Sequence, residues 1–236
     1  MLQRSYYFVE FETFEIPDEG FITYQQQTLE GTGINAEPVS SLKMVEANYY
    51  KGWSRLIGTH ERYDRTPRRM AGNPEYFSES ITGGDKPFDV FYNPQTKRMI
   101  LKTSKTNVKG LLRRMIKNYP SFFVPKEGQV DFAYLLDRLQ NTTVIASWFN
   151  DLKGQVTSVG LFGDRVNLDD KFNYYKAIGS MSALTVELTI KGQNQPCTIM
   201  ITKERGVVIY ENWDQKQDLD FLFNIQHLLF YKNNRQ

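Results

Sequence analysis

Apolar and polar residues alternate strictly toward the end of residues 6–16, close to the amino terminus. Strict alternation is the pattern of a strand with one buried and one solvated face, and the solvated face here is acidic. Turn-forming residues follow at 17–20, and residues 21–24 are again β-formers. The pattern therefore predicts an opening hairpin in which residues 21–24 pair back with the first strand.

Residues 25–84 have poor periodicity and are interrupted by glycines and prolines. Such a stretch predicts loops, short strands and at most one short helix. The periodicity of apolar residues becomes clear after residue 84. We therefore expect a β-rich, loop-rich amino-terminal part over residues 1–84 and an α+β part over residues 85–236.

The second part begins with a strand, a turn and a returning strand over 88–102, because Asn93-Pro94 favours turn initiation and both flanks are rich in β-formers. A helix is expected to follow, with Asn107 as its N-cap and Pro120 at its end. Its apolar residues recur at the spacing of one buried stripe: Val108, Leu111, Leu112, Met115, Ile116 and Tyr119.

The remaining segments alternate between helical and strand patterns. Helices are predicted over 131–140, 169–178 and 217–231, and strands over 142–149, 155–162, 184–191, 197–203 and 207–211. Short turns make neighbouring strands antiparallel. Strands in pairs and triples separated by helices favour an α+β fold, with antiparallel sheets, amphipathic helices packed on one face and an irregular amino-terminal part.

Composition narrows the classes of protein that the chain can belong to. With 236 residues, of which 40% are hydrophobic, the chain can bury a substantial core. Cys197 is the one cysteine, so no intramolecular disulfide forms and a cytoplasmic location is the simplest expectation. Together with His60 and His227 it is too small a ligand set for a structural zinc site. We expect no cofactor, and no segment is apolar enough to span a membrane.

Charge is segregated along the chain although the net charge is only +2. Residues 90–126 contain no Asp or Glu but carry nine basic residues: Lys97, Arg98, Lys102, Lys105, Lys109, Arg113, Arg114, Lys117 and Lys126. A basic face raises the local concentration of polyanions, so nucleic acid of either type is the partner that this segment predicts. On the expected helix, Lys109, Arg113 and Lys117 recur every four residues, with Arg114 beside them.

Two other interpretations of the acid-free segment remain open. Its cations could be compensated within the chain by the acidic first strand, through Glu10, Glu12 and Glu15. Alternatively the basic face could meet an acidic protein, as in a phage, defence or toxin-type complex.

A second basic cluster lies between residues 55 and 69, where arginines are interleaved with His60 and Tyr63 and are preceded by Trp53. Guanidinium groups bind phosphate and aromatic rings stack on unpaired bases, so this cluster is a candidate to assist binding. The simpler alternative is a surface loop in which the arginines pair with neighbouring acids. The candidate residues from this cluster are Arg62, Arg65, Arg68 and Arg69.

Within this cluster, Arg55 and His60 resemble in spacing the Arg-x4-His motif of HEPN-type ribonucleases, over six residues. In that family the motif lies on a helix, whereas Gly58 and Thr59 are poor helix formers. The resemblance implies a metal-independent nuclease that uses His60 with Arg55, Arg62 or Tyr63. Carboxylates at metal-site spacing are not evident, so a metal-dependent nuclease is not supported.

The sequence thus favours a non-catalytic binding or regulatory module, cytoplasmic and of prokaryotic or phage type, whose partner is nucleic acid. The expected binding residues are the eight cations from Lys97 to Lys117 and the four arginines from Arg62 to Arg69 named above. A protein-interaction component with an acidic partner, and a nuclease using His60, are the alternatives.

Overall fold

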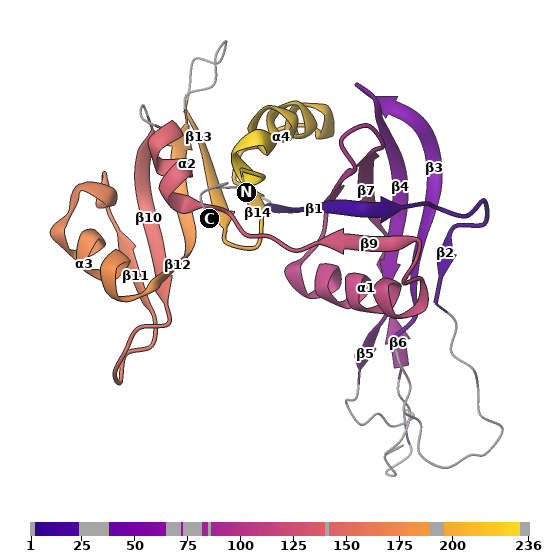
Figure 1. The fold of residues 1–236 in the computed structure, drawn as a ribbon, viewed down its shortest axis with the longest axis horizontal. Coiled ribbons are helices and arrows are strands. Elements are labelled where there is room, and N and C mark those ends of the chain that lie inside the picture. Colours follow the sequence, from indigo (N-terminus) through magenta and orange to yellow (C-terminus); the bar gives the residue numbers. More distant parts are fainter. Residues whose placement is uncertain are drawn as a thin grey trace. The chain divides into compact units, whose positions relative to one another are not determined.

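A computed structural model describes residues 3–23, 38–64, 72, 82–84, 86–139, 142–188 and 196–231, apart from the side chains of residues 63, 64 and 82–84. The chain has an α+β fold (Figure 1) with four α-helices and an open antiparallel sheet of twelve strands among these residues. The α+β prediction is confirmed. The chain forms two compact units, which we call the terminal unit (Met1–Phe8 with Glu127–Gln236) and the middle unit (Val9–Lys126).

Strand β1 (Arg4–Phe14) contributes to both units. Its first residues, Arg4–Tyr7, pair with β14 (Gly206–Ile209), and Glu10–Phe14 pair with β9 (Phe123–Lys126). The predicted first strand is therefore present, within two residues of its expected ends.

The predicted opening hairpin is wrong, because β2 (Phe21–Ile22) pairs with β3 instead of β1. Phe21 is fully buried, and its ring packs against the rings of Phe14, Tyr119 and Phe123. The Tyr119 hydroxyl also donates to the Ile22 carbonyl oxygen at 2.7 Å. Long-range aromatic packing thus directs this short strand away from its neighbour in sequence.

The middle unit has the strand order β1-β8-β7-β4-β3-β2, with β9 on β1. Its other strands are β3 (Ser40–Tyr50), β4 (Trp53–His60), β7 (Phe88–Asn93) and β8 (Arg98–Leu101), and β5 (Arg62–Asp64) pairs with β6 (Thr82–Gly84). The β7–β8 hairpin was predicted, whereas the long β3 and β4 were not. Residues 43–48 of β3 are all exposed, so the alternation by which a strand is recognised is absent there.

The terminal unit has the strand order β11-β10-β12-β13-β14-β1. Its elements are α2 (Phe132–Arg138), β10 (Thr143–Asn150), β11 (Val159–Phe162), the 3-10 helix η1 (Val166–Leu168), α3 (Asp170–Ile178), β12 (Ser180–Leu188), β13 (Cys197–Thr202), β14 and α4 (Gln215–Leu229). Each of the helices and strands predicted after residue 130 is present, with ends shifted by up to four residues. In the described part of the chain, no helix is long and apolar enough to cross a membrane.

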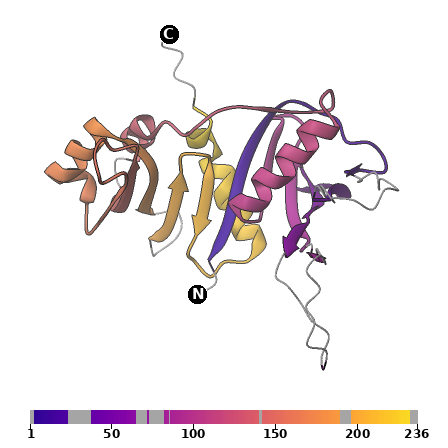
Figure 2. The same ribbon diagram turned by 90° about the horizontal axis from the view of Figure 1, so that it is seen from below.

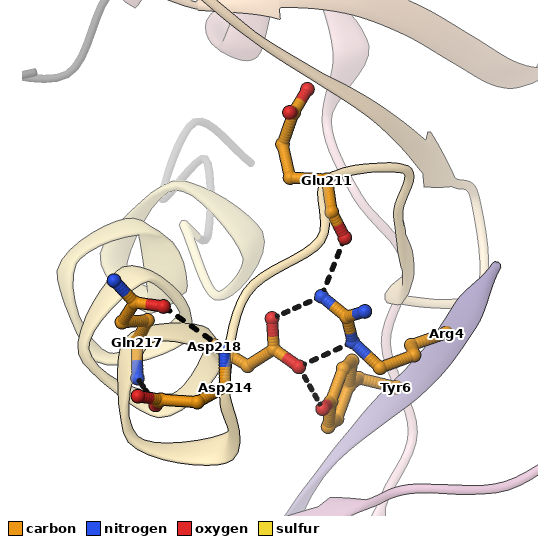
Figure 3. A network of polar contacts seen from close by, with 6 residues as sticks. All are labelled: Arg4, Tyr6, Glu211, Asp214, Gln217 and Asp218. Carbon is orange, nitrogen blue, oxygen red and sulfur yellow. Dashed lines mark hydrogen bonds and ion pairs between the residues drawn. The ribbon is translucent and has the colours of Figure 1, made fainter. Parts of the chain in front are cut away.

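A buried polar network joins the first residues of β1 to α4 in the terminal unit (Figure 3). The guanidinium of Arg4 donates to both carboxylate oxygens of Asp218, at 2.6 and 2.8 Å, and to the Glu211 carbonyl oxygen at 2.7 Å. The Tyr6 hydroxyl donates to Asp218 Oδ2 at 2.6 Å. Asp218 is 0% exposed, so these donors replace the water that its charge would otherwise bind.

Candidate nucleic-acid interface

Helix α1 (Lys105–Asn118) carries the densest group of exposed cations in the acid-free segment. It packs on β3, β4 and β9 of the middle unit and is the long magenta helix in Figure 2. The helix begins at its N-cap Ser104, whose hydroxyl accepts from the Asn107 amide, so the predicted cap at Asn107 is wrong by one turn.

The earlier start of α1 adds one residue to its basic stripe. Four exposed cations, which we call the basic row, recur every four residues: Lys105, Lys109, Arg113 and Lys117. Successive members lie about 6 Å apart along the helix axis, so the row extends for about 18 Å. Like charges four residues apart destabilise a helix by a few tenths of a kcal/mol per pair. An anion lying along the row would turn this repulsion between cations into a net attraction.

Arg62 lies at the amino-terminal end of the basic row. Its Nε donates to Asn107 Oδ1 at 2.9 Å, and a terminal nitrogen donates to Ser104 Oγ at 3.0 Å. These contacts fix the exposed guanidinium beside the first turn of α1. Arg62 was a candidate from the arginine cluster, and the fold brings it to the same surface as the helix cations.

Arg114, by contrast, lies on the buried side of α1 and is only 4% exposed. Burial lowers its pKa, because a charged guanidinium is less stable away from water. Ile116, predicted to be buried, is 43% exposed. Arg114 lies three residues after buried Leu111, whereas Ile116 lies three residues after exposed Arg113, so each shares the helix face of that residue. We therefore exclude Arg114 from the interface.

The cations of the β7–β8 hairpin and of β9 lie beside the acidic first strand. Lys97 Nζ donates to the Glu12 carbonyl oxygen at 2.9 Å, and Lys126 Nζ is 3.7 Å from Glu10 Oε1. Burial lowers the pKa of Arg98, and the negative charge of Glu10 opposes that shift. In this group the Glu10 carboxylate of β1 therefore compensates Lys126 and Arg98, whereas Lys97 contacts a backbone carbonyl. Lys102, just after β8, is half-buried.

The structure does not bring Arg55 and His60 together. Both lie on β4, five residues apart, so their side chains point to opposite faces of the sheet. Arg55 forms an ion pair with Asp89, with 2.7 Å between a terminal nitrogen and Oδ1, and lies over the Tyr49 ring. The side chain of Tyr63 is outside the described residues, as are Arg65, Arg68 and Arg69 entirely.

His60 is 9% exposed and lies beneath α1. Its Nδ1 shares a hydrogen bond with Ser40 Oγ at 2.8 Å. Its Nε2 faces Gly110 so closely that a Cβ built on that glycine would lie 2.0 Å from it. His60 thus has the surroundings of a packing residue between β3 and α1.

Gly110→Ala is expected to destabilise the protein by about 1–3 kcal/mol, through overpacking against the His60 ring. Helix propensity alone predicts the opposite, a gain of about 1 kcal/mol. Urea unfolding shows whether the free energy of unfolding falls or rises in this variant. His60→Ala should make Gly110→Ala less damaging or even favourable, whereas equal effects in both backgrounds would contradict the close packing.

The stability of the protein is expected to fall as the pH drops below about 6.5, the ordinary pKa of histidine. Burial lowers the pKa of His60 in the fold, and the positive charges of Arg113 and Arg62 lower it further, while Glu61 opposes them. As the pH falls, His60 therefore becomes protonated in the unfolded chain before it does in the folded protein. The stability that is present above pH 6.5 is lost as the pH falls from 6.5 through the lower pKa of the folded state. One proton limits the slope to about 1.4 kcal/mol per pH unit.

Thermal melts between neutral and mildly acidic pH measure the pH-dependent contribution of His60 to stability, as the difference between wild type and His60→Asn. His227→Asn serves as the control because His227 is exposed. An unchanged pH profile in His60→Asn, with a changed profile in His227→Asn, would contradict the assignment.

The described residues contain no group of three or more His, Cys, Asp or Glu side chains that could hold a metal ion. A scan against models of known protein families gives no match for this chain, and a search of the curated proteins finds no similar sequence. The candidate function therefore depends on the geometry of the basic row.

Proposed function

We propose that the protein binds nucleic acid through the basic row of α1, assisted by Arg62, and that it does so without catalysis. The observation that carries this proposal is the row itself, four exposed cations at regular spacing on a helix without a single Asp or Glu. Regular spacing favours a ligand with regularly spaced negative charge, and the phosphodiester backbone has this property.

The length of the row favours a polymer. A single phosphate or a small metabolite contacts one or two neighbouring cations, whereas a ligand that uses all four members has to extend for about 18 Å along the helix. The Arg62 guanidinium lengthens the surface at the amino-terminal end of α1. Phosphate contacts of this kind give affinity and orientation without sequence specificity.

The pairing of Arg55 with His60, on which the nuclease interpretation was first based, receives no support from the geometry of these two residues. Arg55 and His60 point to opposite faces of the sheet, and His60 packs under Gly110. Asp89, which lies before the β7–β8 turn, is engaged by Arg55. A binding or regulatory role therefore fits the described residues better than cleavage does.

The test is a fluorescence anisotropy titration of the protein with labelled single- and double-stranded DNA and RNA across a series of salt concentrations. If each member of the basic row neutralises one phosphate, the slope of log K against log salt should be roughly −3.6 on duplex DNA and roughly −2.8 on single strands. Absence of binding to all four ligands, or affinity independent of salt, would contradict the proposal. Retention of an acidic protein in place of nucleic acid would also contradict it.

A further inference from the structure

Strand β11 is the last strand at one end of the strand order of the terminal unit, and among the described strands it pairs with β10 alone. The ladder continues past it, since the Gly163 amide donates to the Ile145 carbonyl oxygen at 3.0 Å. Because bonding alternates along an antiparallel strand, Val159 and Leu161 bond toward β10. The backbone groups of Gly160 and Phe162 therefore point away from β10.

Although β11 is only four residues long, this edge has no charged residue, proline or bulge to block pairing. The sequence from Val159 to Phe162 contains no charged residue and no proline, and its pairing with β10 has no register shift. Exposed edges commonly carry lysine, proline or a bulge that prevents pairing with another chain. An unprotected edge thus indicates a strand that pairs with a partner.

The side chains around the edge are unusually apolar for an exposed surface. Phe162 is 71% exposed, and its ring packs edge-on against Trp148 with 5.5 Å between centroids. Gly160 lies on the same face, where a Cβ would be 2.9 Å from the Phe162 ring. Other large exposed apolar residues lie in the same stretch of the chain: Val156, Leu168, Tyr174 and Ile178.

Charges are balanced in the stretch of chain around β11. Residues 151–178 carry four acids and four bases: Asp151, Asp164, Asp169 and Asp170, with Lys153, Arg165, Lys171 and Lys176. This balance gives a polyanion no net attraction and creates no net repulsion between two identical surfaces. It therefore suits a second copy of the same surface.

We propose that β11 pairs antiparallel with β11 of a second copy of this chain, about a two-fold axis that passes through Leu161. Opposed residues of an antiparallel pair lie on the same face, so Gly160 of each copy faces Phe162 of the other. Gly160 and Phe162 are the residues whose backbone groups point outward. Each of the two Gly160–Phe162 pairs therefore exchanges N–H···O bonds between the copies.

Sedimentation velocity over a concentration series tests this pairing. Wild type is expected to show dimers of twice the mass of one chain that increase with concentration. Phe162→Pro removes an N–H that points outward while keeping the ladder to β10, so this variant should be monomeric. Phe162→Lys adds a blocking charge at the same exposed position and should also be monomeric, which decides the matter if the proline variant does not fold.

Leu168→Lys is the matched control, because Leu168 is also 71% exposed but lies in η1, outside the edge strand. It should dimerise as wild type does. Wild type that remains monomeric at the highest concentration, or a folded Phe162→Lys variant that still dimerises fully, would overturn the proposal. Loss of dimers in Leu168→Lys equal to that in Phe162→Lys would also overturn it, since η1 and not strand pairing would then form the contact.

Discussion

Asp218→Ala should destabilise the protein by about 3–5 kcal/mol, the usual cost of removing one partner of a buried ion pair. Asp218 accepts hydrogen bonds from Arg4 and Tyr6 and is fully buried. Burial raises the pKa of Tyr6, and its hydrogen bond to Asp218 raises it further, so the hydroxyl remains a donor at neutral pH. The substitution removes the acceptor shared by both side chains.

Asp214→Ala in the same helix is the control. Asp214 is the N-cap of α4 and forms a capping box with Gln217 on the protein surface (Figure 3). Loss of such a cap costs about 0.5–2 kcal/mol. Urea unfolding of both variants therefore separates a surface cap from a buried ion pair, and equal losses in the two would show that the network adds no more than the cap.

Charge reversal in the basic row should weaken nucleic-acid binding by about 100-fold or more. The variant Lys109→Glu, Arg113→Glu, Lys117→Glu replaces three exposed cations on one side of α1. Each phosphate contact by an exposed cation is worth about 1 kcal/mol, so three lost contacts alone account for this factor, and repulsion by the new carboxylates adds to it. Arg114 is left unchanged because it is buried.

The matched control reverses three exposed lysines of the terminal unit, Lys153, Lys171 and Lys176. Both triple variants change the net charge by the same amount, so a general effect of charge would weaken binding equally in both. The control should bind within a few-fold of wild type, and circular dichroism checks the fold of each. Equal loss of affinity would contradict a site on α1.

The elements that could be predicted from sequence are those with complete local signals. The β7–β8 hairpin has its turn residues between two apolar flanks, and α4 has a helical period over most of its length. Strand β3 could not be predicted, because residues 43–48 are exposed on both faces and show no alternation. The pairing of β2 with β3 depends on the burial of Phe21 among distant rings.

The candidate site was predictable to a similar extent. The spacing of Lys109, Arg113 and Lys117 was visible in the sequence, but the membership of Lys105 depends on where α1 begins. The position of Arg62 depends on hydrogen bonds to residues more than forty positions away. Pairing between residues so far apart in sequence has no local signal.

The most direct measurement is a lysine acetylation footprint of the wild-type protein, read by mass spectrometry with and without a bound oligonucleotide. Binding along α1 predicts that Lys105, Lys109 and Lys117 become protected, whereas the exposed lysines of the terminal unit, Lys153, Lys171 and Lys176, react as they do in the free protein. Protection of the terminal-unit lysines with full reactivity along α1, under conditions in which the oligonucleotide is bound, would contradict the account.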